Sequence, residues 1–134
     1  MKNTRKPIIS HSDDGRLYKL GASENTQVTF KADGEEVANQ YGITEWWMDE
    51  GGPSPAPHVH EANDELMYVL EGPVSVLTGD TWTKMEKGGL VVIPAGTQHT
   101  FRNDSNQRVG ILNILLGTSY EAMMPHIVKV FAGR

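Results

Sequence analysis

GPSPAPHVHEANDELMYVLEG, residues 52–72, is the most informative stretch of this chain. His58 and His60 stand two residues apart, which on an extended backbone places both imidazoles on one face, about 6–7 Å apart. Glu65 begins the apolar segment that follows, where an inward-facing carboxylate is costly without a cation. This pattern indicates a metal site at the start of a buried strand.

A second stretch, residues 88–103, has the sequence GGLVVIPAGTQHTFRN and supplies a third histidine. Pro94 and Gly96 predict a sharp turn, after which His99 begins a strand with Phe101 on the same face. Three imidazoles and one carboxylate suit a divalent transition metal and leave one or two positions of an octahedral site open. The candidate metal ligands are therefore His58, His60, Glu65 and His99. A lone histidine is more often a surface or core residue, and we interpret His11 and His126 in that way.

Length and composition exclude several classes of protein. The chain has 134 residues and a mass of 14.8 kDa, which predicts one domain over residues 1–134. A net charge of −5 supplies no basic face for nucleic acid, and the lack of cysteine excludes disulfides and thiolate chemistry. The apolar runs are too short to span a membrane or to form a signal peptide. We expect a soluble, cytoplasmic protein with no nucleic-acid or membrane partner.

Short segments rich in β-branched and aromatic residues alternate with glycines and prolines, which predicts an all-β antiparallel sandwich or barrel. Gly79-Asp80 is expected to form a hairpin turn. Residues 1–15 are interpreted as a loosely held arm, and the tail, residues 119–134, as a short helix with Ser119 as a possible cap and Pro125 limiting it. The expected strands are Leu17–Leu20, Gln27–Lys31, Tyr41–Met48, Glu65–Glu71, Val74–Thr78, Thr81–Met85, Leu90–Ile93, His99–Arg102 and Val109–Leu116.

Both stretches resemble the two sequence motifs of the cupin superfamily, and all ten specified positions match. The first motif is Gly, five residues, His-x-His, three or four residues, Glu, six residues and Gly. It is met by Gly52, His58, His60, Glu65 and Gly72. The second motif is Gly, five residues, Pro-x-Gly, two residues, His, three residues and Asn. It is met by Gly88, Pro94, Gly96, His99 and Asn103. This motif core, residues 52–103, has a 15-residue spacer (73–87), as in compact bacterial members.

The resemblance implies a double-stranded β-helix, or jelly-roll barrel, with the metal inside one mouth. It assigns the ligand role to the four candidates named above, and a scaffold role to Gly72, Gly88 and Asn103. The cofactor is then one divalent transition metal ion. Mn, Fe, Co, Ni, Cu and Zn all accept these donors, so the metal identity stays open.

Alternation along the strands predicts which side chains line the cavity. Phe101 shares the face of His99, and Met67 and Val69 share that of Glu65. Trp46 and Trp47 are further candidates, of which only one faces the cavity because neighbours on a strand point to opposite faces. A cavity with few charges disfavours sugar phosphates, which need arginine or lysine clamps.

The residues around the second motif resemble single-domain cupins similar to quercetin dioxygenase. The resemblance predicts a metal-dependent, dioxygenase-like enzyme acting on an enol, catechol or flavonol that chelates the metal, with Glu65 as the catalytic proton acceptor. Non-redox isomerisation or hydrolysis, and a small-molecule binding or sensing module without turnover, remain alternatives. A structural barrel is disfavoured by the complete ligand set. An open sheet edge and the N-terminal arm predict a homodimer.

Overall fold

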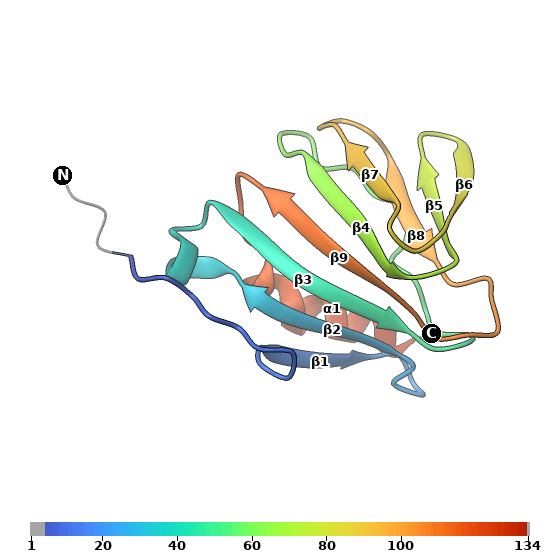
Figure 1. The fold of residues 1–134 in the computed structure, drawn as a ribbon, viewed down its shortest axis with the longest axis horizontal. Coiled ribbons are helices and arrows are strands. Elements are labelled where there is room, and N and C mark those ends of the chain that lie inside the picture. Colours follow the sequence, from blue (N-terminus) through green and yellow to red (C-terminus); the bar gives the residue numbers. More distant parts are fainter. Residues whose placement is uncertain (1–4, 134) are drawn as a thin grey trace.

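The computed structural model describes residues 5–133 and consists of two antiparallel sheets and a short C-terminal helix (Figure 1). The larger sheet has the order β1-β2-β3-β9-β4-β7 and the smaller one the order β6-β5-β8. The strands are β1 (Arg16–Leu20), β2 (Thr26–Ala32), β3 (Tyr41–Met48), β4 (Glu65–Glu71), β5 (Val74–Thr78), β6 (Thr81–Met85), β7 (Leu90–Ile93), β8 (His99–Arg102) and β9 (Val109–Leu116). The expected all-β fold is confirmed; only β1, by one residue at its start, and β2, by one residue at each end, differ from the expected bounds.

The two sheets enclose an apolar core because each strand alternates between a covered and an open face. In β3, buried and half-buried residues alternate over its whole length, so that Trp46 and Met48 face inward. The same period places Met67 and Val69 of β4 and Val76 of β5 in the core. The hairpin at Gly79 is also present, with a positive φ of 62° that glycine adopts without strain.

The C-terminal segment folds back behind the first strands as η2 (Glu121–Met123) and α1 (Met124–Ala132) (Figure 1). Pro125 lies in the first turn of α1, where its missing N–H leaves no hydrogen bond unmade. The expected cap is wrong: Ser119 Oγ instead accepts a hydrogen bond from Gly34 N and donates one to Tyr41 O. Met124 is fully buried and anchors the tail.

The N-terminal arm is less loose than expected over the part that the structure describes. Lys31 Nζ donates to the carbonyl oxygens of His11, Ser12 and Asp14, which ties this segment to β2. Residues 1–4 of the arm, and residue 134 of the tail, lie outside the described residues.

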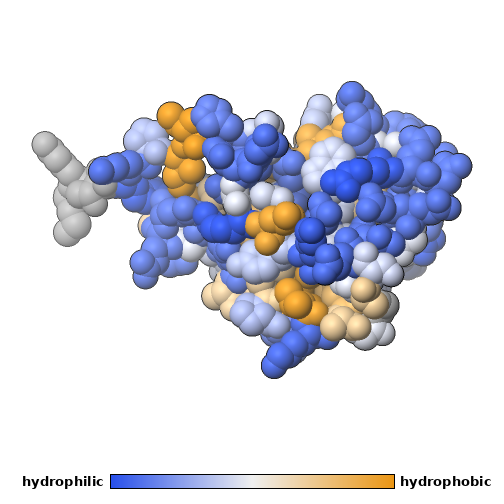
Figure 2. Space-filling view, turned by 90° about the horizontal axis from the view of Figure 1, so that it is seen from below, coloured by the Kyte–Doolittle hydropathy of each residue, from blue (hydrophilic) through white to orange (hydrophobic). Residues whose placement is uncertain are grey.

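Within residues 5–133, no helix has the length and apolar character that a membrane crossing requires. Seen from below, the surface is mostly hydrophilic, with isolated apolar residues and a group of adjoining apolar residues across its lower middle (Figure 2).

Candidate metal centre

Four side chains from three parts of the chain meet inside one end of the barrel. Glu65 begins β4, His99 begins β8, and His58 and His60 lie in the loop before β4. The backbones of His58 and His99 exchange two hydrogen bonds, of 3.0 and 2.9 Å, which brings the loop against β8. One nitrogen or oxygen atom from each of the four side chains lies within 4.8 Å of the others. The structure thus brings together every candidate ligand.

Backbone carbonyls set the protonation of two of the imidazoles. His58 Nδ1 lies 2.8 Å from Ala56 O, and His99 Nδ1 lies 2.8 Å from Thr97 O. A carbonyl oxygen only accepts hydrogen bonds, so Nδ1 must carry the proton in both rings. Nε2 is then left with a free lone pair in each neutral ring, which is the form that binds a metal.

The spacing of the donors also fits a metal ion. Glu65 Oε1 lies 3.1 Å from His60 Nε2 and 3.3 Å from His99 Nε2. Ligands at right angles around a metal, with bonds of about 2.1 Å, stand about 3 Å apart. Asn113 Nδ2 donates to Glu65 Oε2 at 2.9 Å and so holds the other oxygen of the carboxylate away from the imidazoles. The cluster is able to hold a metal ion.

The surroundings shift the pKa values of three of these groups, and they favour the metal-binding form of Glu65 and His58 but not of metal-free His99. Burial alone would raise the pKa of Glu65, but hydrogen bonds with His60 and His99 outweigh it and lower the pKa to about 2. Burial lowers the pKa of His58, which favours its neutral form. Burial opposes protonation of His99 as well, yet the contact with Glu65 is stronger, so the pKa of His99 is raised.

A cavity of about 440 Å³ opens from the cluster, and its wall is mainly apolar. Trp46 and Phe101 line it, as expected from their strand faces, and their rings pack edge to face with centroids 5.4 Å apart. The cavity residues that carry polar atoms in their side chains are Trp46, His58, His60, Glu65, Asn113 and Tyr120. None of the described lining residues is lysine or arginine.

Three of the expected lining residues lie elsewhere. Met67 and Val69 face inward as predicted, but they are fully buried deeper in the core, because alternation gives the face of a strand and not the depth along it. Trp47 faces outward: its indole lies over Gly110, where a Cβ would collide with the ring, and its Nε1 donates to Glu45 Oε1 at 3.0 Å. Trp46 is the tryptophan that faces the cavity.

The sequence interpretation predicted the short C-terminal helix, but it missed Asn113, Tyr120 and the position of this helix beside the cavity. Asn113 interrupts the apolar run of β9, and a polar residue at a buried strand position is a usable signal for a site. Tyr120 and α1 have no such signal, because they reach the cavity from the end of the chain. Met123, Ile127, Val130 and Phe131 cover the mouth of the cavity.

A set of hydrogen bonds holds this cover in place. The buried carboxylate of Asp33, just before η1 (Gly34–Val37), accepts hydrogen bonds from the backbone of Tyr120 and Glu121 at 2.9 and 3.0 Å. Glu121 in turn accepts hydrogen bonds from Arg16 Nε and Tyr18 Oη, both at 2.8 Å. Tyr120 Oη lies 2.9 Å from Thr44 Oγ1, and burial raises the pKa of this phenol so that it stays protonated.

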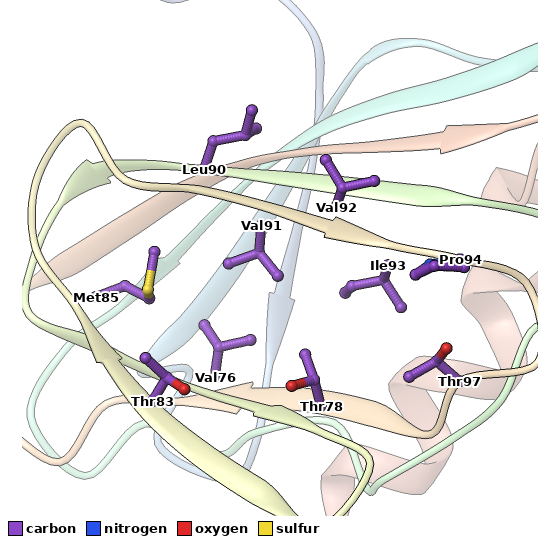
Figure 3. Close-up of a pocket in the computed structure, with 10 residues that line it drawn as sticks. All are labelled: Val76, Thr78, Thr83, Met85, Leu90, Val91, Val92, Ile93, Pro94 and Thr97. Atoms are coloured by element: carbon purple, nitrogen blue, oxygen red, sulfur yellow. The ribbon is translucent and has the colours of Figure 1, made fainter.

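The barrel contains a second cavity, of about 340 Å³, between the β4–β7 edge and the β5–β6 hairpin (Figure 3). Its wall consists of aliphatic side chains, Met85, Pro94 and three threonines. Val91 and Ile93 point into it, toward Val76 and Thr78, whereas Leu90 and Val92 point away (Figure 3). No group that titrates near neutral pH lines it among the described residues.

The cupin domain profile matches residues 45–115, which is more than half of the chain. This chain belongs to the cupin domain family. The matched segment contains all four candidate ligands, together with Trp46, Phe101 and Asn113.

Two curated relatives of this cupin are dioxygenases. It is 35% identical over 57 residues to quercetin 2,3-dioxygenase of Bacillus subtilis, covering 41% of this chain and 17% of the relative. It is 34% identical over 65 residues to acireductone dioxygenase of Gallus gallus, covering 45% of this chain and 36% of the relative. The cupin thus spans well under half the length of these relatives.

A solved structure confirms the fold over most of the cupin. A predicted oxalate decarboxylase from Thermotoga maritima superposes with a TM-score of 0.72 and 15% identity, covering 82% of this chain and 99% of the other. The jelly-roll barrel expected from the sequence motifs is therefore confirmed. The fold hosts many reactions, so the chemistry must be argued from the site.

Proposed function

We propose that this cupin is a metal-dependent dioxygenase that acts on a small, uncharged, largely apolar molecule with two adjacent oxygen atoms. The observation that supports this most is that a cluster of three histidines and one glutamate adjoins a mainly apolar cavity. No lysine or arginine is among the described residues that line this cavity. The local similarity to two dioxygenases favours oxygen chemistry over other reactions.

The four clustered residues would hold a divalent transition metal, with His58 and His99 binding through Nε2. Such an ion supplies Lewis-acid polarisation of substrate oxygens and, when it is redox-active, a route for electrons to O₂. The low pKa of Glu65 keeps its carboxylate ionised and ready to bind the cation. The same low pKa makes Glu65 a weak base, so it accepts a proton only from a strongly acidified hydroxyl.

The cavity wall selects and orients the substrate. Trp46, Phe101 and Phe131 present aromatic surfaces on which a planar ring packs. The protonated phenol of Tyr120 is a hydrogen-bond partner for a substrate oxygen at the polar end of the cavity. An anionic substrate would find no arginine or lysine here to compensate its charge, which disfavours sugar phosphates and small dicarboxylates.

The helix α1 excludes water from the cavity. Its residues Ile127, Val130 and Phe131 cover the mouth, and the carboxylate of Asp33 anchors the segment that leads into it. Exclusion of water strengthens the electrostatic interactions between a bound substrate and the polar end of the cavity.

The test is oxygen uptake and substrate loss with the full chain after reconstitution with Fe(II), Mn(II), Co(II), Ni(II), Cu(II) or Zn(II) in separate preparations. Each preparation is mixed with quercetin, with a catechol, and with a sugar phosphate as the charged comparison. We expect O₂ consumption that matches loss of an uncharged substrate with at least one metal, and none in the His58→Ala/His99→Ala variant. The metal content of each preparation is measured in parallel.

Three other outcomes would contradict the proposal. Equal turnover by the double variant would place the chemistry outside the cluster. Tight binding of an uncharged ligand without oxygen uptake, with every metal, would indicate a binding module. Turnover that needs Zn(II) and no oxygen would indicate a non-redox isomerase or hydrolase.

A further inference from the structure

Thr44 places a hydroxyl at a fully buried position of β3. It lies between Gly42 and Trp46 on the inner face of the strand, and its side chain has no exposed surface. A valine would fill the same space with the same β-branched shape, so the hydroxyl itself needs a reason. Within residues 5–133, its one hydrogen bond joins Thr44 Oγ1 to Tyr120 Oη at 2.9 Å.

The position of the Tyr120 ring does not depend on Thr44. The backbone N–H of Tyr120 donates to Asp33 Oδ2 at 2.9 Å, and the ring packs on Phe30 with centroids 4.8 Å apart. Gly42 lies beside the same ring, where an ideal Cβ would stand 3.2 Å from the ring carbon Cδ1. These contacts fix the place of the phenol oxygen, so the hydroxyl of Thr44 affects the direction of the phenol proton.

The indole of Trp46 occupies one lone pair of the phenol oxygen. Trp46 Nε1 lies 3.4 Å from Tyr120 Oη, and an indole N–H only donates hydrogen bonds. A tyrosine hydroxyl has one proton and two lone pairs, so one lone pair and the proton remain. The hydrogen bond with Thr44 uses one of these two, depending on which hydroxyl donates.

The two directions of this hydrogen bond leave different protons without a partner. If Tyr120 donates, the proton of Thr44 is left over at a site that is fully buried and is not part of the cavity wall. An unpaired buried donor is unfavourable. If Thr44 donates, the proton left over belongs to Tyr120, which lines the cavity, where water or a ligand accepts it. Donation by Thr44 is therefore favoured.

We propose that Thr44 is a positioning residue of this site, which donates to Tyr120 and thereby directs the phenol proton into the cavity. With Trp46 and Thr44 both donating to it, the phenol oxygen has no lone pair left for a ligand. Tyr120 then acts only as a donor, and the site selects a ligand that presents an accepting oxygen at this place. This role rests on the proposed function, since it concerns ligands held at the metal cluster.

The sheet register places the phenol beside the metal cluster. Thr44 pairs with Asn113 across β3 and β9, which lie side by side in Figure 1, so their side chains adjoin on the inner face. Asn113 Nδ2 donates to Glu65 Oε2 at 2.9 Å. One strand spacing of about 4.8 Å therefore separates the threonine that contacts the phenol from the amide that contacts the carboxylate. A planar ring with two adjacent oxygens is large enough to contact both groups.

The test is the binding of tropolone, a planar uncharged ring with two adjacent oxygens, to the full chain loaded with Zn(II). Zn(II) has no redox chemistry, so the ligand is not oxidised by O₂ at the metal. Calorimetric titration measures the Kd for the wild type, Thr44→Val, Thr44→Ser, Tyr120→Phe and the double variant Thr44→Val/Tyr120→Phe. Thr78→Val makes the same change in the second cavity and is the matched control. Denaturant unfolding and zinc content show whether each variant is folded and loaded.

We expect Tyr120→Phe to weaken tropolone binding by about 10-fold or more, because a hydrogen bond to a charged oxygen is lost. Thr44→Val should weaken it about threefold, since a phenol that accepts a hydrogen bond is a stronger donor. In the Tyr120→Phe background, Thr44→Val should have no further effect, because Thr44 acts through the phenol. Thr44→Ser keeps the hydroxyl, and both it and Thr78→Val should bind as the wild type does.

Other results would overturn the role of Thr44. Tighter binding by Thr44→Val would show that the phenol donates to Thr44 in the wild type. Unchanged binding, a loss shared by Thr44→Ser, or a loss that adds to that of Tyr120→Phe would show a purely structural hydroxyl. If Thr44→Val does not fold, Thr44→Ala takes its place with the same expectations.

Failure of this role and failure of the proposed function give different results. A wild type that consumes O₂ but does not bind tropolone, or binds it without the expected pattern, would remove only the role of Thr44. The expected pattern of tropolone binding, with no O₂ consumption by any metal form, would remove only the dioxygenase.

Discussion

The two cavities of the barrel differ much more in chemistry than in size. The cavity beside the histidines has a volume of about 440 Å³, and the one between β7 and the β5–β6 hairpin about 340 Å³. The first is lined by two imidazoles, a carboxylate that contacts the third imidazole, an amide and a phenol, whereas the polar side chains of the second are threonine hydroxyls among mainly aliphatic residues. A hollow in a barrel is thus not itself a site, and the converging donors distinguish one cavity from the other.

The largest expected effect comes from removing one imidazole. His99→Ala deletes a donor that is almost fully buried and leaves Glu65 with one histidine contact fewer. We expect metal affinity, measured by calorimetric titration, to fall at least about 100-fold. Thr78→Val, in the second cavity, is the control and is expected to bind as the wild type does. Equal affinity in both variants would remove the distinction between the cavities.

Metal addition is expected to stabilise the wild type. A ligand that binds only the folded state at a free concentration of 100 times its Kd raises the free energy of unfolding by about 2.7 kcal/mol. Denaturant unfolding with and without the metal measures this difference. For the His99→Ala variant, we expect the denaturant midpoint of unfolding to be the same with and without the metal. An equal rise in the variant would show that the metal binds outside the cluster.

A smaller effect is expected from Asn113, which touches Glu65 and none of the three histidines by hydrogen bond. Asn113→Ala removes the donor to Glu65 Oε2 and frees the carboxylate to rotate. Loss of such an orienting partner lowers metal affinity by about 10–100-fold, and the unpaired oxygen destabilises the fold by about 1–3 kcal/mol. Calorimetry and denaturant unfolding measure the two quantities. Wild-type affinity would mean that the histidines alone position the ion.

The smallest effect is expected in the second cavity. Thr78→Val replaces a hydroxyl on its wall by a methyl group, next to Val76 and Ile93. We expect the free energy of unfolding to change by less than about 1 kcal/mol, in the stabilising direction, because an apolar wall gains an apolar group. Denaturant unfolding measures it. A loss of several kcal/mol would show that this hydroxyl has a structural role that the first cavity's residues do not share.

The four clustered residues could be found from the sequence because their signals are local. His58 and His60 are related by the two-residue period of an extended chain, and Glu65 and His99 each begin a strand whose bounds were predicted correctly. Asn103 also has the scaffold role expected of it, since its Nδ2 donates to Met48 O and Gln107 O. Turn residues and apolar alternation depend on near neighbours, and near neighbours are what a sequence displays.

The cavity wall could not be found in this way. Trp46 and Trp47 are chemically equal candidates until the structure shows which face of the sheet is covered. The side chain of Met67 points inward as predicted, but it lies deeper in the core than the cavity does. Tyr120 lies 55 residues after Glu65 in the chain, and it joins the site only because Asp33 holds the backbone of its segment. Contacts at such separations depend on how the strands pair.

The sequence by itself therefore determined the strands, the covered face of each and the set of metal donors, because these depend on residue type and a period of two. The tertiary structure decided the depth of each inward side chain and the enclosure of the cavity by α1. These properties arise from the register between strands and from hydrogen bonds that join distant segments, and no local pattern specifies either of them.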